Sequence, residues 1–378
     1  MEIKYRKVLE TLKSEILRGK YSSSSVFPSR AMLIRRFGIS NLTAVKVVSK
    51  LKDDGFVRSY QGSGTFVTRT ANSHKIGLIV PGVAYSDFYA PIVGEISGLS
   101  LYEGYTLLLG DASSTDEKKR AAQAHQFVDR LLKENVAGVI FQPFDISSQK
   151  DHINAEIESK FKKAGVPVVL LDCDVCFPSS RSKLDVVGID NYWAGYRIAE
   201  HLISVGARNI HFLMNAKRGK NILNYTPSVF LRFQGARAAI ESGLGQCQQN
   251  VLNARYDNVD AIRRHIVRFA PDAFVCGNDN HALRLIKTLQ GLGYKVPGDI
   301  RVTGFDDIKM SSLMTPSLTT VHQPCSEIAC AAFRRLLARI ADPELPPETI
   351  SLNVELVLRE STAVSSNVSP VKKGARCK

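Results

Sequence analysis

The sequence has no stretch that could serve as a membrane span or an export signal. None of its apolar runs approaches the roughly 20 residues that a membrane-spanning helix needs. The N-terminus, MEIKYRKVLETL, is charged throughout and lacks the apolar segment of a signal peptide. We therefore expect a cytoplasmic protein without a membrane partner.

Motifs for metals, disulfides and nucleotide cofactors are also missing. The seven cysteines are scattered, and Cys173 and Cys176 form a lone C-x-x-C without the second pair of ligands that a zinc site needs. No G-x-G-x-x-G follows the first apolar strand, no G-x-x-x-x-G-K-[ST] occurs, and no nucleophile–base pairing is visible. We expect no metal, no cofactor and no catalytic residues.

The net charge of +14 is concentrated at one end of the chain. Residues 1–72 contain 14 Lys and Arg against 5 Asp and Glu, and the segment from Ser361 adds four more positive charges. The long middle of the chain is therefore almost neutral. A generically basic protein would spread its charge, whereas a basic segment of this kind is expected where a protein contacts nucleic-acid phosphates.

The basic segment is patterned as three helices. In the first, residues 4–19, apolar residues recur at helical spacing. The second begins at Pro28 and Ser29 and ends at Gly38, and Ser40 is suited to cap the third. The exposed face of that third helix is predicted to carry Asn41, Val45, Lys46 and Lys50.

Two short strands follow the helices. FVRSY and GTFVT alternate like strands around a tip that contains Gly62 and Gly64, and glycine permits positive φ and close approach to another molecule. Three helices and a two-stranded wing form a winged helix-turn-helix, a domain that binds duplex DNA.

This segment resembles the N-terminal domain of GntR-type bacterial regulators. The pattern FPSR…L…FGIS…T…V…L…DGFVRSYQGSGTFV carries the resemblance over residues 4–68. Members of that family usually have guanine-reading arginines at the positions of Ala31, Asn41 and Val45. Asn41 can bond an adenine edge and Val45 can pack on a thymine methyl group, so we expect an operator that depends less on guanines, unless these are merely drifted surface positions. The residues expected to contact DNA are Arg30, Ser40, Asn41, Thr43, Val45, Lys46, Gly62, Ser63 and Gly64.

From residue 75 onward, apolar stretches of strand length alternate with helical segments. The predicted strands are KIGLIV, YTLLLG, VAGVIFQ, VPVVLLD, DVVGID, NIHFLM, DAFVCG and IRVTGFD. The predicted helices include residues 92–103, 117–134, 194–205, 228–242 and 282–291. The alternation predicts an α/β fold with doubly wound parallel sheets, which bind ligands at the carboxyl ends of their strands.

Polar and aromatic residues gather where these strands end. The candidate ligand-binding residues are Phe88, Tyr89, Asp190, Trp193, Arg232, Asn278, Asp279 and Asp306. Carboxylates and an arginine beside aromatic rings suit a small, hydroxyl-rich ligand. Each residue also has a structural interpretation: Asn278 and Asp307 can cap helices, Trp193 can belong to the core, and Arg232 can lie on the surface.

Residues 75–362 resemble the effector domain of LacI/GalR regulators. The resemblance rests on IGLIVPG, GVPVVLLD, VGIDN, R.QGARAAI, AFVCGNDNHA, GYKVPGDIRVTGFDD and TPSLTTVHQP. It implies two periplasmic-binding-protein-like α/β lobes crossed by three strands, with a sugar in the cleft. By position, the implied ligand contacts are Asp190, Arg232, Asp279 or its neighbour, and Asp306, with Phe88 near the cleft. A GntR-like head on a LacI-like body is the arrangement of AraR-like regulators.

The expected organisation is a winged helix-turn-helix domain at 1–68, a linker at 69–74, a two-lobed effector domain at 75–362 and a disordered tail at 363–378. We expect a homodimeric transcriptional regulator, most simply a repressor, that binds operator DNA under the control of a small polar effector. Two alternatives stay open. A sugar-modifying α/β enzyme would use the aspartates as acid/base groups, and a sugar-binding protein without DNA function would use the head as an inert adaptor.

Overall fold

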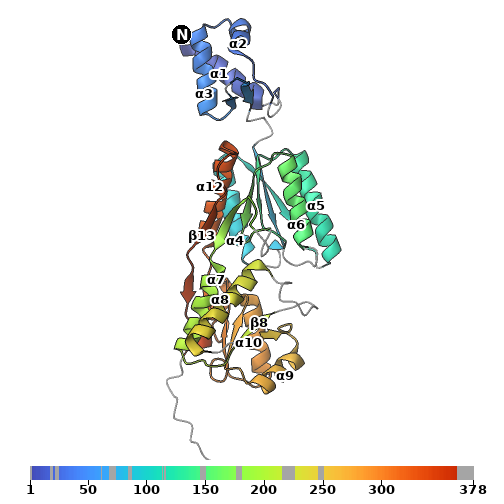
Figure 1. Cartoon of the computed structure of the whole chain (residues 1–378), viewed down its shortest axis with the longest axis vertical. Helices are drawn as coiled ribbons and strands as arrows, with labels where there is room; N and C mark the ends of the chain where they lie inside the picture. The colour runs from blue at the N-terminus through green and yellow to red at the C-terminus, as the bar shows by residue number, and fades with distance from the viewer. Residues whose placement is uncertain are drawn as a thin grey trace, which may run out of the picture.

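The computed structural model describes residues 2–17, 20–21, 25–60, 62–67, 74–83, 87–112, 114, 116–144, 150–175, 181–214, 226–245 and 251–363. Most of the expected linker, Cys176 and the expected tail from residue 364 lie outside these residues. The described chain folds into a small N-terminal head and two α/β lobes (Figure 1).

The head contains three helices followed by a two-stranded wing, as predicted. Its elements are α1 (Glu2–Leu17), α2 (Arg30–Phe37), α3 (Asn41–Asp53), β1 (Val57–Tyr60) and β2 (Gly64–Val67). One leucine from each helix, Leu12, Leu33 and Leu51, is fully buried in a common core. β1 and β2 pair antiparallel and continue directly from α3.

Two serines fix where α2 and α3 begin. Ser29 Oγ accepts the backbone N–H of Met32 at 3.3 Å, and Ser40 Oγ accepts that of Thr43 at 3.2 Å. These bonds satisfy N–H groups that have no partner inside the first helical turn. α2 then ends at Gly38, whose φ of 57° lies in the left-handed region that glycine adopts readily.

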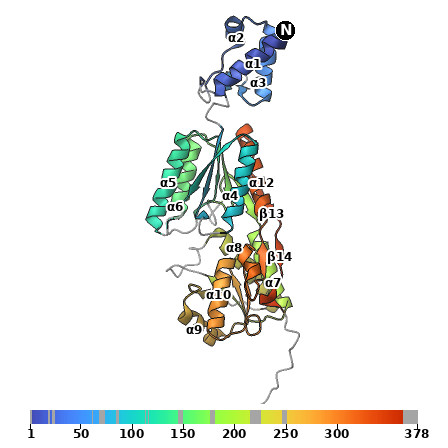
Figure 2. The same cartoon turned by 180° about the vertical axis from the view of Figure 1, so that it is seen from behind.

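The first lobe is built on a six-stranded sheet whose paired strands are all parallel, in the order β13-β7-β6-β5-β3-β4. Its strands are β3 (Lys75–Val80), β4 (Thr106–Asp111), β5 (Gly138–Phe141), β6 (Val168–Leu171), β7 (Asp185–Ile189) and β13 (Thr349–Leu352). The helices are α4 (Tyr89–Tyr102), α5 (Glu117–Lys133), α6 (Lys150–Lys163) and α12 (Cys325–Ala341). α4 and α12 bury one face of the sheet and α5 and α6 the other (Figure 2). The inner strands β3, β5 and β6 are accordingly apolar on both sides.

The second lobe repeats this plan with four parallel strands in the order β11-β10-β8-β9. They are β8 (Ile210–Met214), β9 (Val251–Asn253), β10 (Ala273–Cys276) and β11 (Arg301–Thr303). α7 (Asn191–Ser204) and α8 (Pro227–Leu244) cover one face, and α9 (Val259–Phe269) and α10 (Asp279–Gly291) cover the other. The short α11 (Lys309–Leu313) follows β11.

The chain passes between the lobes three times. It leaves the first lobe where β7 runs into α7, returns where β12 (Thr320–His322) runs into α12, and leaves again where β13 continues into β14 (Glu355–Val357). β12 and β14 pair antiparallel, and η3 (Glu360–Thr362) ends the described chain against the second lobe. The α/β architecture and the parallel sheets are confirmed.

Candidate functional site

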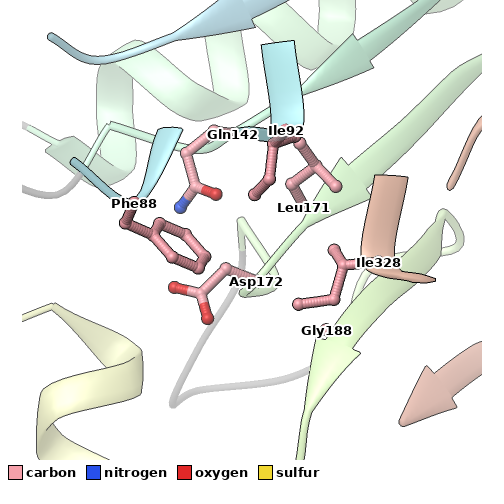
Figure 3. Close-up of a pocket in the computed structure, with 7 residues that line it drawn as sticks. All are labelled: Phe88, Ile92, Gln142, Leu171, Asp172, Gly188 and Ile328. Carbon is pink, nitrogen blue, oxygen red and sulfur yellow. The ribbon is translucent and has the colours of Figure 1, made fainter. Parts of the chain in front are cut away.

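A hollow lies at the carboxyl ends of the first-lobe strands. It is lined by Phe88, Ile92, Gln142, Leu171, Asp172, Gly188 and Ile328. Figure 3 shows the Phe88 ring with Gln142 on one side and the Asp172 carboxylate on the other. An apolar ring between an amide and a carboxylate suits a ligand with one C–H face and hydroxyl groups at its rim.

Polar groups continue from this hollow into the second lobe. Asn191 Nδ2, at the start of α7, lies 3.5 Å from Asp172 Oδ1, and Asn191 Oδ1 accepts Arg232 Nε at 2.8 Å. The Arg232 guanidinium is 3.6 Å from Asp306 Oδ1, which also accepts Gln323 Nε2 at 2.6 Å. We call these five residues, Asp172, Asn191, Arg232, Asp306 and Gln323, the polar chain. It connects both lobes with two of the crossing segments.

Close packing of α7 and α8 holds Asn191 beside Arg232. A Cβ on Gly195 would lie 2.0 Å from the Arg232 carbonyl oxygen, and a Cβ on Gly235 would lie 1.8 Å from that of Tyr192. Only glycine allows the two backbones to approach so closely. Arg232 is 5% exposed, and its planar group stacks on the Phe305 ring at 3.6 Å.

Burial sets the electrostatics of the polar chain. It lowers the pKa of Arg232, whose charge is supported by Asp306, Asp172 and Asp279. It raises the pKa of Asp306 to about 7, with the neighbouring Arg232 opposing the rise. The carboxylates outnumber the single guanidinium, so the site has a surplus of hydrogen-bond acceptors.

Two buried amide oxygens add to that surplus. Gln142 Oε1 and Gln323 Oε1, each on a side chain 2% exposed, accept no hydrogen bond within the described part of the chain. Gln142 lines the hollow and Gln323 belongs to the polar chain. Buried acceptors are normally paired, so these unpaired oxygens indicate places for donor groups.

Two of the predicted residues cap helices, and a third is buried. Asp190 is exposed and caps α7 by accepting the Trp193 N–H at 2.8 Å, and Asn278 caps α10 through the His281 N–H at 2.9 Å. Asp279 needs a correction as a direct ligand contact. It is 0% exposed, and its oxygens accept bonds from Ser311, Thr320 and Ile308.

The predicted aromatic residues lie in two places. Phe88 lines the hollow and meets Tyr89 edge-on at 5.3 Å. Trp193 is 50% exposed in the first turn of α7 and stacks on Tyr196. The structural alternative that placed Trp193 in the core is therefore wrong.

Sequence reasoning missed Asp172, Gln142, Asn191 and Gln323. Asp172 ends the stretch VPVVLLD in the same way that Asp190 ends DVVGID, so the signal was present. Its φ of 65° is a conformation that few non-glycine residues adopt, and it is visible only in the structure. Within the described ranges, no group of three His, Cys, Asp or Glu is placed to hold a metal.

The outer face of α3 is the second candidate site. Ala44, Val47 and Leu51 point into the head, whereas Asn41, Leu42, Val45 and Lys46 are exposed on the opposite side. Arg30 begins α2 and is exposed as well. Thr43 is half-buried, with its hydroxyl 2.9 Å from that of Ser40.

The wing presents its backbone at the tip. Gly62 and Gly64 have φ values of 80° and 110°, and both are exposed together with Ser63. Residues with side chains rarely adopt these angles, so the tip requires glycine. The Ser63 N–H donates to the Tyr60 carbonyl oxygen at 3.1 Å and closes the turn. An exposed helix face beside an exposed wing tip suits the grooves and phosphates of DNA.

Known families match two parts of the chain. The family described as bacterial regulatory proteins, gntR family, matches residues 4–67, and the periplasmic binding protein-like domain matches residues 199–362. The chain is a GntR-type head joined to a periplasmic-binding-protein-like body. The two resemblances stated from the sequence are confirmed.

Several curated relatives share this arrangement or its body. The arabinose metabolism transcriptional repressor of Geobacillus stearothermophilus is 25% identical over 95% of this chain and 97% of its own length. The HTH-type transcriptional repressor PurR of Vibrio campbellii is 28% identical over 72% of this chain and 77% of its own length.

Solved structures match the body. A LacI family transcriptional regulator from Enterococcus faecium with bound ribose is 25% identical, with a TM-score of 0.62, and covers 76% of this chain and 98% of its own. The transcription regulator GntR from Chromobacterium violaceum is 25% identical, with a TM-score of 0.61, over 76% of this chain and 99% of its own. No helix in the described ranges is both long and apolar enough to span a membrane.

Proposed function

We propose that this protein is a transcriptional repressor whose affinity for operator DNA is set by a small neutral polar effector, a sugar, bound between the lobes. The observation that carries the proposal is the polar chain, because it joins both lobes and two crossing segments. The regulators named above support it: one is named for arabinose metabolism and another holds ribose.

Each member of the polar chain has a role toward hydroxyl groups. The carboxylates of Asp172 and Asp306 accept hydrogen bonds from hydroxyl groups, and Arg232 and Asn191 donate to hydroxyl or ring oxygens. Phe88 covers a C–H face of the effector. Asp190 and Trp193, exposed at the start of α7, stay candidates for contact with it.

DNA affinity then depends on how the lobes close. Two heads on a homodimer meet half-sites at a fixed helical spacing, so a shift of a few ångströms between heads changes operator affinity. The exposed edge strand β4 supports a dimer, because Leu109 on it and Leu101 and Tyr102 at the nearby end of α4 are 43%, 80% and 87% exposed. A cytoplasmic location belongs to the same proposal.

The experiment is an effector screen by thermal shift, starting with pentoses, followed by titration of the full chain. Binding raises the melting temperature by mass action, and Asp172→Asn should abolish the shift. Asp257→Asn is the matched control, since Asp257 is exposed and pairs with Arg255 on the surface of the second lobe. Equal shifts in both variants would refute the placement of the effector.

Turnover separates this proposal from the enzyme alternative. The sugar that raises the melting temperature should be recovered unchanged after prolonged incubation with the protein. Selection from random duplexes separates it from a binding protein without DNA function. A head that selects no sequence and shows no salt-dependent binding would refute the repressor assignment.

A further inference from the structure

Two large apolar side chains are exposed on the outer face of α3. Leu42 is 64% exposed and Val45 is 38% exposed, although the same helix buries Ala44, Val47 and Leu51 completely. Leu42 is therefore presented outward in the first turn of the helix. Exposed apolar residues are common on protein surfaces, so their neighbours decide what they mean.

The neighbours of Leu42 and Val45 are polar or basic. The two residues are three apart and therefore adjacent on one side of the helix. Asn41 lies one turn before Val45, and Lys46 lies one turn after Leu42, both exposed. The face therefore combines a small apolar surface with an amide and an ammonium group. Such a face suits a polyanion that also carries apolar groups.

The major groove of DNA has one apolar group, the C5 methyl of thymine. We propose that Leu42 and Val45 are specificity-determining residues that pack on thymine methyl groups of the operator, while Lys46 contacts phosphate. This inference rests on the proposed function, since it requires α3 to enter the major groove. It names the chemistry that the face reads and adds Leu42 to the residues expected to contact DNA.

The expected effect follows from the size of one methyl group. Burying a single apolar carbon contributes about 0.8 kcal/mol, which corresponds to about a fourfold change in affinity. Uracil differs from thymine only in lacking the methyl group, so a thymine-to-uracil exchange removes this contact and leaves every base-edge hydrogen bond in place. The exchange isolates apolar readout from all other contributions.

The experiment uses the full chain and an operator obtained by selection from random duplexes. Each thymine is replaced in turn by uracil, and affinity is measured for the wild type and for Leu42→Ala, Val45→Ala and Leu358→Ala. Leu358 is a matched control because it is a leucine 61% exposed on the body. At one or more thymines, exchange for uracil should lower the DNA affinity of wild type and of Leu358→Ala about fourfold. At the thymine that the replaced side chain would contact, the same exchange should leave the DNA affinity of Leu42→Ala or Val45→Ala unchanged.

Three outcomes would overturn the inference. The first is wild-type affinity that is unchanged by every exchange while sequence-specific binding persists. The second is that Leu42→Ala and Val45→Ala lose the same affinity, relative to wild type, on the thymine duplex as on the uracil duplex. That result indicates an effect on the head rather than on a methyl contact. The third is failure to select any sequence, which refutes the proposed function itself and is distinguishable because no operator exists to scan.

Discussion

Replacing Asp279 by alanine should destabilise the second lobe by about 3–5 kcal/mol. Its carboxylate accepts the hydroxyls of Thr320 and Ser311 at 2.6 Å each and the Ile308 N–H at 3.0 Å. The two hydroxyl-bearing residues are themselves fully buried. Each buried donor that loses its acceptor costs about 1–3 kcal/mol. Because the two hydroxyls can rotate toward other acceptors, we expect the sum over the three donors to lie in the lower part of its range.

Asparagine at the same position should be milder, and its effect should depend on pH. Burial raises the pKa of Asp279 from an ordinary 3.8 to about 6, so the folded state favours the protonated acid. The stability linked to this raised pKa is present below pH 4 and is lost as the pH rises through 6. This change in the pKa of Asp279 corresponds to up to about 3 kcal/mol of stability. The difference in free energy of unfolding between wild type and Asp279→Asn should therefore shrink by up to that amount between pH 4 and pH 8.

Urea unfolding followed by tryptophan fluorescence measures this effect. Trp193 is the only tryptophan and lies in α7, so the signal reports the body and is silent for the head. Asp257→Ala, an exposed change in the same lobe, should stay within about 0.5 kcal/mol of wild type. The reasoning is refuted if Asp279→Ala unfolds within about 1 kcal/mol of wild type, or if the difference between wild type and Asp279→Asn is the same at both pH values.

Two further predictions use urea unfolding, and a third uses effector titration. Gly235→Ala should lower the free energy of unfolding by more than about 2 kcal/mol, because its Cβ would lie 1.8 Å from a carbonyl oxygen of α7, whereas Gly291→Ala, with open space around it, should be nearly neutral. His265 Nε2 and His211 Nδ1 lie 2.8 Å apart, and burial lowers the pKa of His211 to about 4. The free energy of unfolding measured in urea should therefore fall as the pH drops from 6.5 toward 4, and it should fall less steeply in His265→Gln. Since burial raises the pKa of Asp306 to about 7, effector affinity measured by titration should fall about tenfold per pH unit below 7, and a pH-independent affinity would exclude its carboxylate from the contact.

The sequence predicted the buried strands well and the peripheral elements poorly. Strands such as β3, β5 and β8 are covered on both faces, so they appear as unbroken apolar runs that periodicity detects. β9, β12 and β14 have three residues each, and β13 is half-exposed and pairs with β7 from far along the chain. Short, half-exposed strands with distant partners carry no local signal.

The candidate site shows the same limit. Asp172 and Asp190 both follow an apolar strand, and only the structure shows that the first faces the hollow while the second is occupied as a helix cap. Asp279 looked like a ligand contact because it follows β10. Its partners Ser311 and Thr320 lie 32 and 41 residues further on, so its burial could not be read from its neighbours. In the head, all the signals are local, and the caps at Ser29 and Ser40 were predicted correctly.

The position of the polar chain explains how a small effector could control DNA binding. An effector shifts an equilibrium only by the difference between its affinities for the two states. Asn191 and Gln323 belong to segments that cross between the lobes, so their contacts must change when the lobes move. A hundredfold change in operator affinity requires about 3 kcal/mol, which two or three hydrogen bonds made in only one state supply at about 1 kcal/mol each. Because the coupling is reciprocal, DNA must change the effector affinity by the same hundredfold factor. The five residues of the polar chain offer enough hydrogen-bonding groups to supply this coupling free energy.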